Sequence, residues 1–385
     1  MRDRSTTKGP KVASNFSSRE FREKHTKRDL GVDEGLLDAN LDANLLKCNE
    51  ATFVCRKPTT GLGALERLPA EMLQTILLDL DLNTFGAFTC VNRRSLEVVE
   101  SLSEYSAVMT HAPKAYLGAL TIKSGAWITF RRLYEKLCTR DCETCGDFGG
   151  YLYLITCKRV CFICLVEDKR YLPLDPGHAT DEYGFDRHTL RMLPRMAQVQ
   201  GNYSPQFSES HGRLFIDYQS IVDAAVKIRG SVDAVNQQLE KLRQKRNARF
   251  QRELTEIWDG IEDELDLLED RGPPGPSHER QYSNPLRFMA ITRAPWFNKS
   301  TRGADWGVNC RGCGHTIYKD LDFKRKFTED TFQKHLEELG DGKAAHFAAH
   351  FAPYVSPCVD KRRAFLRRPP VPKIPRSHAM AGCLQ

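Results

Sequence analysis

The pattern of apolar and polar positions changes sharply near residue 65. Residues 1–60 are polar and mixed in charge, with a small Leu-Asp-Ala-Asn repeat over 37–44 and no helical or strand period. Low hydrophobic density without a period is typical of disorder, because such a segment cannot bury enough apolar surface to offset the loss of chain entropy. We therefore predict a disordered tail over 1–60 and a folded region after it.

Three short helices are predicted between residues 65 and 110. The first follows Pro69, whose missing N–H suits the start of a helix, and it carries Glu71 in its first turn. The second begins near Asn83-Thr84, and the third is opened by Val91-Asn92-Arg93-Arg94. Their apolar residues at helical spacing are Met72, Leu73, Ile76, Leu77 and Leu80, then Phe85 and Phe88, then Leu96, Val99 and Leu102. Three helices of this size leave an apolar face exposed unless something covers it.

A longer helical region is predicted from Phe215 to about Asp270. Apolar residues recur at spacings of three and four, at Ile221, Ala225, Ile228, Val232, Val235, Leu239 and Leu242, and again at Leu254, Ile257, Ile261, Leu265 and Leu268. Glycines and arginines interrupt this stripe, so we expect a helical hairpin or a long helix docked on its own protein rather than a dimerising coiled coil. The sequence Gly-Pro-Pro-Gly-Pro at 272–276 ends the region as a linker.

Two cysteine triplets with the same spacing are the strongest chemical signal in the chain. Cys138, Cys142 and Cys145 form C-x3-C-x2-C, and Cys157, Cys161 and Cys164 repeat it 19 residues later. Two C-x2-C turns can close a tetrahedron of thiolates around zinc, so we predict a site formed by Cys142, Cys145, Cys161 and Cys164. Gly146 suits the turn after the first pair, and Tyr151–Ile155 is predicted to be a strand returning to the second. A segment this short cannot bury enough apolar surface to fold alone. Structural zinc supplies roughly 10–16 kcal/mol of binding free energy, which can stabilise it.

A second metal site is predicted around Cys310-Arg-Gly-Cys313, another C-x2-C turn with glycine at the bend. No second pair lies nearby, so its remaining ligands must come from afar. One completion uses His335 together with His346 or His350. The other completion follows from the number of cysteines, since six in the triplets and two here make eight. Cys138 and Cys157 would then join Cys310 and Cys313, giving two sites of four cysteines each.

Composition narrows the cellular setting. No run approaches 18 apolar residues and the start lacks the apolar segment of a secretory signal, so we expect no membrane span and a cytoplasmic or nuclear protein. A reducing compartment favours metal binding over disulfides for the 13 cysteines. The net charge of +7 is carried by residues 361–385, which hold seven Lys/Arg and no acidic residue. The rest of the chain is balanced, which argues against a protein that coats nucleic acid.

The N-terminal helices resemble the F-box, whose pattern runs Leu-Pro-x-Glu, Ile-Leu, a Leu-rich turn and Val-Asn-Arg-Arg. The matching residues are Leu68, Pro69, Glu71, Ile76, Leu77, Leu80, Phe85, Phe88, Val91, Asn92 and Arg93. Beyond them, 105–174 and later landmarks resemble fungal F-box proteins with a cysteine-rich segment. Those landmarks are Tyr183-Gly184, Leu193-Pro194, Gly201-Asn202-Tyr203-Ser204, Trp306-Gly307 and Phe332-x-x-His335. Related sequences place a cysteine four or five residues after that histidine, where this chain has Leu339 and Gly340.

The resemblance implies a substrate-recruiting subunit of an SCF-type cullin–RING ubiquitin ligase. It implies docking on a Skp-type adaptor, and through it a cullin, by Leu68, Pro69, Met72, Ile76, Leu77 and Leu80, with an unidentified protein as the recruited target. No nucleophile, general base or phosphate-binding loop stands at motif spacing, so we expect a non-catalytic subunit with structural zinc.

The fold class expected is mainly α with small zinc-stabilised β or irregular modules. The expected organisation is a disordered tail (1–60), an F-box (65–110), a Cys-rich zinc module (111–175), a helical region (176–271), a Pro/Gly linker (272–284), a second zinc module with C-terminal helices (285–358) and a basic disordered tail (359–385). The alternative function is zinc-dependent binding of nucleic acid or chromatin, with bases stacking on Tyr151, Tyr153 and Phe162. Because the charge outside the tail is balanced, a nucleic-acid partner is the less expected of the two.

Overall fold

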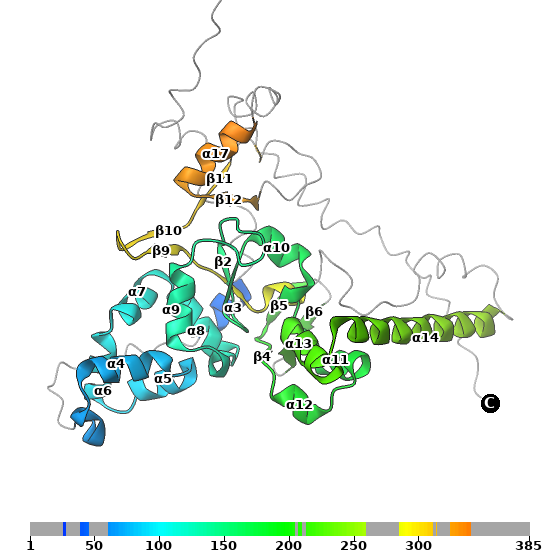
Figure 1. The fold of residues 1–385 in the computed structure, drawn as a ribbon, viewed down its shortest axis with the longest axis horizontal. Helices are drawn as coiled ribbons and strands as arrows, with labels where there is room; N and C mark the ends of the chain where they lie inside the picture. The colour runs from blue at the N-terminus through cyan, green and yellow to red at the C-terminus, as the bar shows by residue number, and fades with distance from the viewer. Residues whose placement is uncertain are drawn as a thin grey trace, which may run out of the picture.

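The computed structural model describes residues 26–27, 39–45, 61–204, 207–209, 213–258, 285–310, 313 and 324–339. Helices dominate these residues, and the strands form small sheets of two or three members (Figure 1). This agrees with the expected fold class of a mainly α protein with small β modules. Within the described residues, no helix is both long and apolar enough to span a membrane.

The three predicted N-terminal helices are present, and local capping explains their boundaries. They are α4 (Ala70–Asp79), α5 (Leu82–Thr89) and α6 (Arg93–Glu100), preceded by the 3-10 helix η2 (Gly63–Arg67). The Asp81 carboxylate accepts the N–H groups of Asn83 and Thr84, which starts α5. Asn92 and Ser95 form a reciprocal capping box at the start of α6.

The main core joins these helices to the cysteine-rich region. The next helices along the chain are α7 (Ser103–His111), α8 (Pro113–Thr121), η3 (Gly125–Trp127) and α9 (Phe130–Cys138). Phe85 of α5 stacks on Phe130 of α9 with ring centroids 4.2 Å apart, and both are buried in the same apolar cluster as Leu77. The three N-terminal helices therefore share one core with helices α7 to α9.

The cysteine-rich segment is built around the central strand of a three-stranded sheet. Strand β2 (Tyr151–Tyr153) pairs on one side with β3 (Lys158–Val160) and on the other with β8 (Ile291–Arg293). The predicted strand reached Ile155, but the chain turns after Tyr153. Strand β3 leads into α10 (Phe162–Glu167) and η4 (Lys169–Tyr171).

The guanidinium of Arg159 ties this sheet together from inside the core. It is fully buried and donates to the carbonyl oxygens of Gly149, Lys136 and Ala294 at 2.7, 3.1 and 2.9 Å. Ala294 comes directly after β8, so residues on both sides of the Pro/Gly segment satisfy one buried cation. The sequence suggested separate zinc modules at 111–175 and 285–358, whereas the structure makes β8 an integral strand of the first.

Part of the predicted disordered tail is ordered in the structure. Helix α3 (Ala39–Asn44) contains the whole second Leu-Asp-Ala-Asn repeat, and its Leu41 is only 2% exposed, packed in the main core beside Gly118. Asp42 pairs with Lys114 of α8. Strand β1 (Thr26–Lys27) pairs with β11 (Val308–Cys310). A single anchoring leucine gives no period, so the sequence pattern could not reveal α3.

A second core lies beneath α13 (Tyr218–Arg229) and the first turns of α14 (Val232–Trp258). It also includes α11 (Pro176–Tyr183) and α12 (Arg187–Arg191), next to β4 (Arg195–Ala197), which pairs with β7 (Leu214–Ile216). Strands β5 (Gly201–Ser204) and β6 (Phe207–Glu209) form a separate hairpin. These short strands lie inside the region predicted to be helical, and Phe215 belongs to one of them.

The predicted apolar stripe breaks between α13 and α14. Gly230 adopts a left-handed conformation with φ of 84° and ends α13, so α14 leaves in a new direction. Ile221, Ala225 and Val235 are buried as predicted, but Ile228 is 67% exposed and Val232 is also exposed. Beyond its first turns, α14 extends away from the body (Figure 1). The prediction of helices here is correct, but only α13 and the first turns of α14 contribute buried residues to a core, and residues 259–271 of the predicted region lie outside the described residues.

The C-terminal part forms a small third core. After η6 (Pro285–Phe288) and β8 come the hairpin β9 (Trp296–Asn298) and β10 (Gly303–Asp305), then β11 (Val308–Cys310), β12 (Lys326–Phe327) and α17 (Glu329–Leu339). Strand β11 lies between β1 and β12. Cys310, Phe327, Phe332 and Leu336 form the buried cluster. The Pro/Gly segment and the basic tail lie outside the described residues.

Candidate metal centres and an exposed apolar helix face

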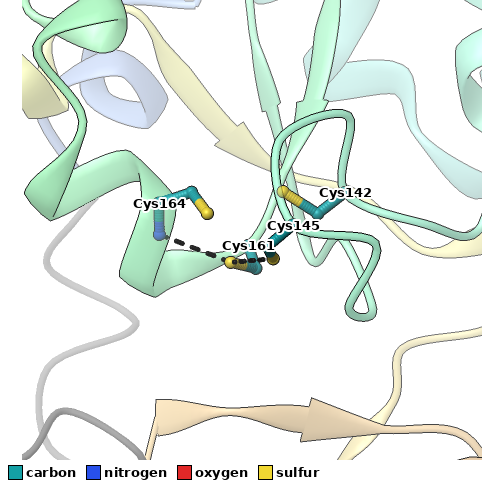
Figure 2. A group of neighbouring side chains, drawn as sticks. All are labelled: Cys142, Cys145, Cys161 and Cys164. Carbon is teal, nitrogen blue, oxygen red and sulfur yellow. Dashed lines mark hydrogen bonds between the residues drawn. The ribbon is translucent and has the colours of Figure 1, made fainter.

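The four cysteines of the predicted first site converge on one point. The Sγ atoms of Cys142, Cys145, Cys161 and Cys164 all lie within 4.8 Å of one another, and Figure 2 shows the side chains turned inward from two separate turns. The Sγ atoms of Cys145 and Cys161 are 3.6 Å apart. Four 2.3 Å bonds to a tetrahedral metal place sulfurs about 3.8 Å apart, whereas a disulfide bond is about 2.05 Å long. The geometry is that of a tetrad able to hold a metal ion.

Local backbone structure positions each pair of ligands. In the first turn, the Gly146 N–H donates to the Cys142 carbonyl at 2.9 Å, and Gly146 has φ of 82°, which favours glycine. In the second, Cys161 is the N-cap of α10 and its sulfur accepts the N–H of Cys164 at 3.4 Å. The sulfur of Cys142 likewise accepts the N–H of Thr144 at 3.5 Å. Backbone donors aimed at sulfur stabilise the thiolate form that binds metal.

The electrostatics of the tetrad also favour a cation. The thiol of Cys161 donates to Cys142 and lowers the pKa of Cys142 to about 4. The same hydrogen bond, together with burial, raises the pKa of Cys161. Burial and the charge on Cys142 raise the pKa of Cys164. Four crowded sulfurs therefore cannot all ionise by themselves, and a divalent cation at their centre supplies the charge that allows it.

Three of the residues predicted for the second site also come together. The ligand atoms of Cys310, Cys313 and His335 lie within 4.8 Å of one another, and the Cys313 Sγ is 3.4 Å from the His335 Nε2. Tetrahedral zinc bonds of 2.3 Å to sulfur and about 2.05 Å to nitrogen predict about 3.6 Å. The His335 ring stacks on Phe327 at 4.4 Å, which fixes its orientation. The predicted further ligand, His346 or His350, lies outside the described residues.

Cys138 and Cys157 do not complete this site, so the four-cysteine alternative is wrong. Cys138 ends α9 and shares a side-chain hydrogen bond with Tyr134. Burial raises the pKa of the Cys138 thiol. Cys157 sits fully buried in the turn between β2 and β3 with φ of 50°, and burial raises its pKa to about 12. Neither joins Cys310 and Cys313. The first cysteine of each triplet therefore packs in the fold, and only the C-x2-C part of the repeat contributes to a candidate metal centre.

The residues predicted to dock on an adaptor divide between two environments. Met72 is 53% exposed and Ile76 44% exposed on α4; Pro69 is also exposed, and Leu68 and Leu80 are half-buried. Leu77 is only 2% exposed, so its assignment to an intermolecular interface is wrong. One residue along a helix is a turn of about 100°, which takes Leu77 from the face of Ile76 to the face of Leu73, in the core.

Sequence reasoning missed two other exposed apolar residues of this segment. Leu65 of η2 and Val91 before α6 are both exposed. The η2 segment is held against α6, because the Asn92 side chain donates to the Gly61 carbonyl at 3.1 Å and Glu66 pairs with Arg94 at 3.8 Å. Val91 lies within the quoted Val-Asn-Arg-Arg motif, which was the available signal. Leu65 lies on a 3-10 turn, which has no period to detect.

The aromatic residues suggested for base stacking belong to the core. Tyr151 and Tyr153 are buried on β2, and Phe162 is half-buried at the start of α10. Tyr153 packs edge-on against Tyr171 at 5.4 Å between centroids. The predicted stacking surface of the nucleic-acid alternative is therefore wrong.

Comparisons with known proteins identify no relative of this chain. The chain gives no significant match to protein-family models, to curated proteins or to solved structures. A functional assignment therefore depends on the residues and geometry described above.

Proposed function

We propose that this protein is a non-catalytic, substrate-recruiting subunit of an SCF-type cullin–RING ubiquitin ligase that docks on a Skp-type adaptor through α4. The observation that supports it best is the exposure of Met72 and Ile76 on a helix whose adjoining face is already buried. These two residues belong to the segment that resembles the F-box. The cytoplasm or nucleus, the setting expected from the sequence, is where such a ligase acts.

The two faces of α4 explain why a partner is needed. Met72 and Ile76 are one turn apart and lie on one side, while Leu73 and Leu77 bury the adjoining side in the main core. A solvent-facing helix surface is ordinarily polar, so a pair of large apolar side chains there is the pattern of a helix that enters a groove. Exposed Pro69 at the N-cap extends the same surface toward η2.

The proposed mechanism is proximity. The protein would hold a target close to a ubiquitin-conjugating enzyme and raise its effective concentration, while supplying no catalytic residue of its own. This role requires a rigid body between the adaptor and the target. We propose that both centres hold structural zinc; in the first, four thiolates would fill a tetrahedral sphere and leave no open position for water. Zinc supplies a cross-link between the loop after α9 and the start of α10.

Co-purification of the full chain with a Skp-type adaptor tests this proposal. Ile76→Asp places a charge in the expected interface and should weaken binding by about 100-fold or more. Ile228→Asp is the matched control, because Ile228 is the same residue type, is 67% exposed on α13 and does not belong to the residues proposed for docking. Zinc content and circular dichroism should remain unchanged in both variants.

Stoichiometric binding that is lost with Ile76→Asp and kept with Ile228→Asp supports the assignment. Absence of binding by the folded, zinc-loaded wild type contradicts it. Equal loss in the two variants also contradicts it, since binding would then not depend on the α4 face.

A further inference from the structure

The short helix α3 docks on the body of the protein through a single buried leucine. It lies against α8 and β5 (Figure 1). Leu41 is 2% exposed and belongs to the main core, where it lies beside Gly118 of α8. A Cβ atom added at Gly118 would be only 3.0 Å from the Leu41 Cδ2 atom. The missing side chain at Gly118 therefore makes the space that the leucine occupies.

Two polar contacts flank this leucine and add specificity. Asp42 forms an ion pair with Lys114, which lies one turn before Gly118 on α8. The Asn44 Nδ2 donates to the carbonyl oxygen of Gln200 at 2.6 Å, directly before β5. The residue between them, Ala43, is exposed. The body therefore contacts a Leu-Asp-x-Asn pattern, and we call Lys114, Gly118 and the Gln200 carbonyl the α3 site.

Helix α3 has the properties of a tethered peptide ligand. It is six residues long, and a helix this short is unstable in water by itself, so its helical form depends on docking. Residues 46–60 connect it to η2 and lie outside the described residues. A connection of that length holds a segment near its site at an effective concentration on the order of millimolar. The α3 site therefore binds a short segment that is covalently attached to the same chain.

The chain carries the recognised tetrapeptide twice. Residues 37–40 and 41–44 are both Leu-Asp-Ala-Asn. A shift of four residues along a helix is slightly more than one turn and about 6 Å, so it brings the same residue types close to the same partners. A structural anchor needs only one copy. Two identical copies are what a site that recognises the tetrapeptide itself, in whichever segment carries it, would bind.

We propose that the α3 site recognises short helical segments with a Leu-Asp-x-Asn pattern, and that such a segment of a target protein binds there by displacing α3. The leucine would enter the space beside Gly118, and the aspartate would pair with Lys114. None of the residues proposed for adaptor docking belongs to this site, so one molecule can hold adaptor and target together. The role of the bound segment as a recruited target depends on the proposed function, whereas binding of the motif does not.

Fluorescence anisotropy of a labelled peptide tests the site in the full, zinc-loaded chain. The peptide has the sequence of residues 37–44, and its control has alanine in place of both leucines. Leu37→Ala/Leu41→Ala in the full chain disables both internal copies, so the peptide no longer competes with α3. It should bind this variant about 30-fold or more tightly than the wild type, and should raise the unfolding midpoint of the variant. Leu214→Ala, at an exposed leucine of β7, is the control that should bind like the wild type.

Charge reversal tests recognition without emptying a buried site, because the Lys114 side chain is 43% exposed. Lys114→Glu should bind a peptide with lysine in place of each aspartate about fivefold more tightly than the Leu-Asp-Ala-Asn peptide, whereas the wild type should keep the opposite order. The ratio of the two affinities cancels the competition by α3. Lys227→Glu, at an exposed lysine of α13, is the charge-matched control and should keep the wild-type order.

Tighter binding to the Leu37/Leu41 variant together with a reversed peptide preference in the Lys114 variant supports the proposal. Equal affinity for the wild type and the Leu37/Leu41 variant, equal binding of the alanine peptide, or an unchanged preference in the Lys114 variant overturns it. If the Leu37/Leu41 variant does not fold, the charge reversal decides by itself. Adaptor co-purification depends on α4, so its failure contradicts the proposed function and leaves the peptide result unaffected.

Discussion

At the scale of single residues, the role of a cysteine is decided by the backbone that presents it. Cys142 and Cys161 lie at turns whose N–H groups point at sulfur. Cys138 ends a helix next to Tyr134, and Cys157 lies buried in a β-turn. The C-x3-C extension, which is the same in both triplets, left the roles of Cys138 and Cys157 open. The C-x2-C part was sufficient to identify the ligands of the tetrad.

Replacing single cysteines tests this division. Cys164→Ser should lower bound zinc by one equivalent per chain, since it removes one of four thiolates, and should lower the unfolding midpoint by about 10 °C or more, at about 2–4 °C per kcal/mol lost. Cys138→Ser should keep the full zinc content. Metal analysis by mass spectrometry and thermal unfolding followed by circular dichroism provide the measurements. Zinc loss in the Cys138 variant, or none in the Cys164 variant, would show that the tetrad is misassigned.

At the scale of elements, sequence patterns predicted helices where capping and periodicity agree. Pro69 and Asn92 marked the starts of the first and third N-terminal helices, and the second, predicted to begin near Asn83-Thr84, begins at Leu82 after the Asp81 cap. Strands β4 to β7 were missed because three or four residues are too few for an alternating pattern to be recognised. The same limit applies to α3. Its docking depends on one leucine and on a cavity that only the folded core creates.

Leu41→Ala tests whether α3 is a structural part of the fold. The substitution empties a buried site in the main core, so we expect the free energy of unfolding to fall by about 2–5 kcal/mol. Urea denaturation followed by tryptophan fluorescence measures it. Leu214→Ala is the matched control, because Leu214 is exposed on β7, and it should cost no more than about 0.5 kcal/mol. Similar small effects at both positions would mean that 39–45 does not dock.

At the scale of the whole molecule, segments that are distant in sequence depend on one another. Strand β8 lies beside β2 with Thr292 opposite Leu152, and Arg287 donates to the carbonyl oxygens of Leu165 and Asp168, both at 2.8 Å. The sequence predicted a linker at 272–284 and hence a boundary there. Composition indicates where a chain is loosely connected, but it carries no information about which strands pair across the connection. The two candidate metal centres therefore belong to segments that share one sheet.

A protease site introduced between Pro273 and Pro276 tests this dependence. After cleavage, the fragments before and after the site should co-elute in gel filtration under native conditions, because β8, Met289 and Phe297 are buried in the core formed by the first fragment. Thr292→Pro should separate them, since proline removes the N–H of a residue in the middle of β8 and cannot be accommodated against a central strand. Asn298→Ala, at the end of β9, is the control that should leave the fragments together. Fragments that separate without any substitution would mean that 285–297 is a module of its own, as the sequence alone suggested, and that the second metal centre folds independently of the first.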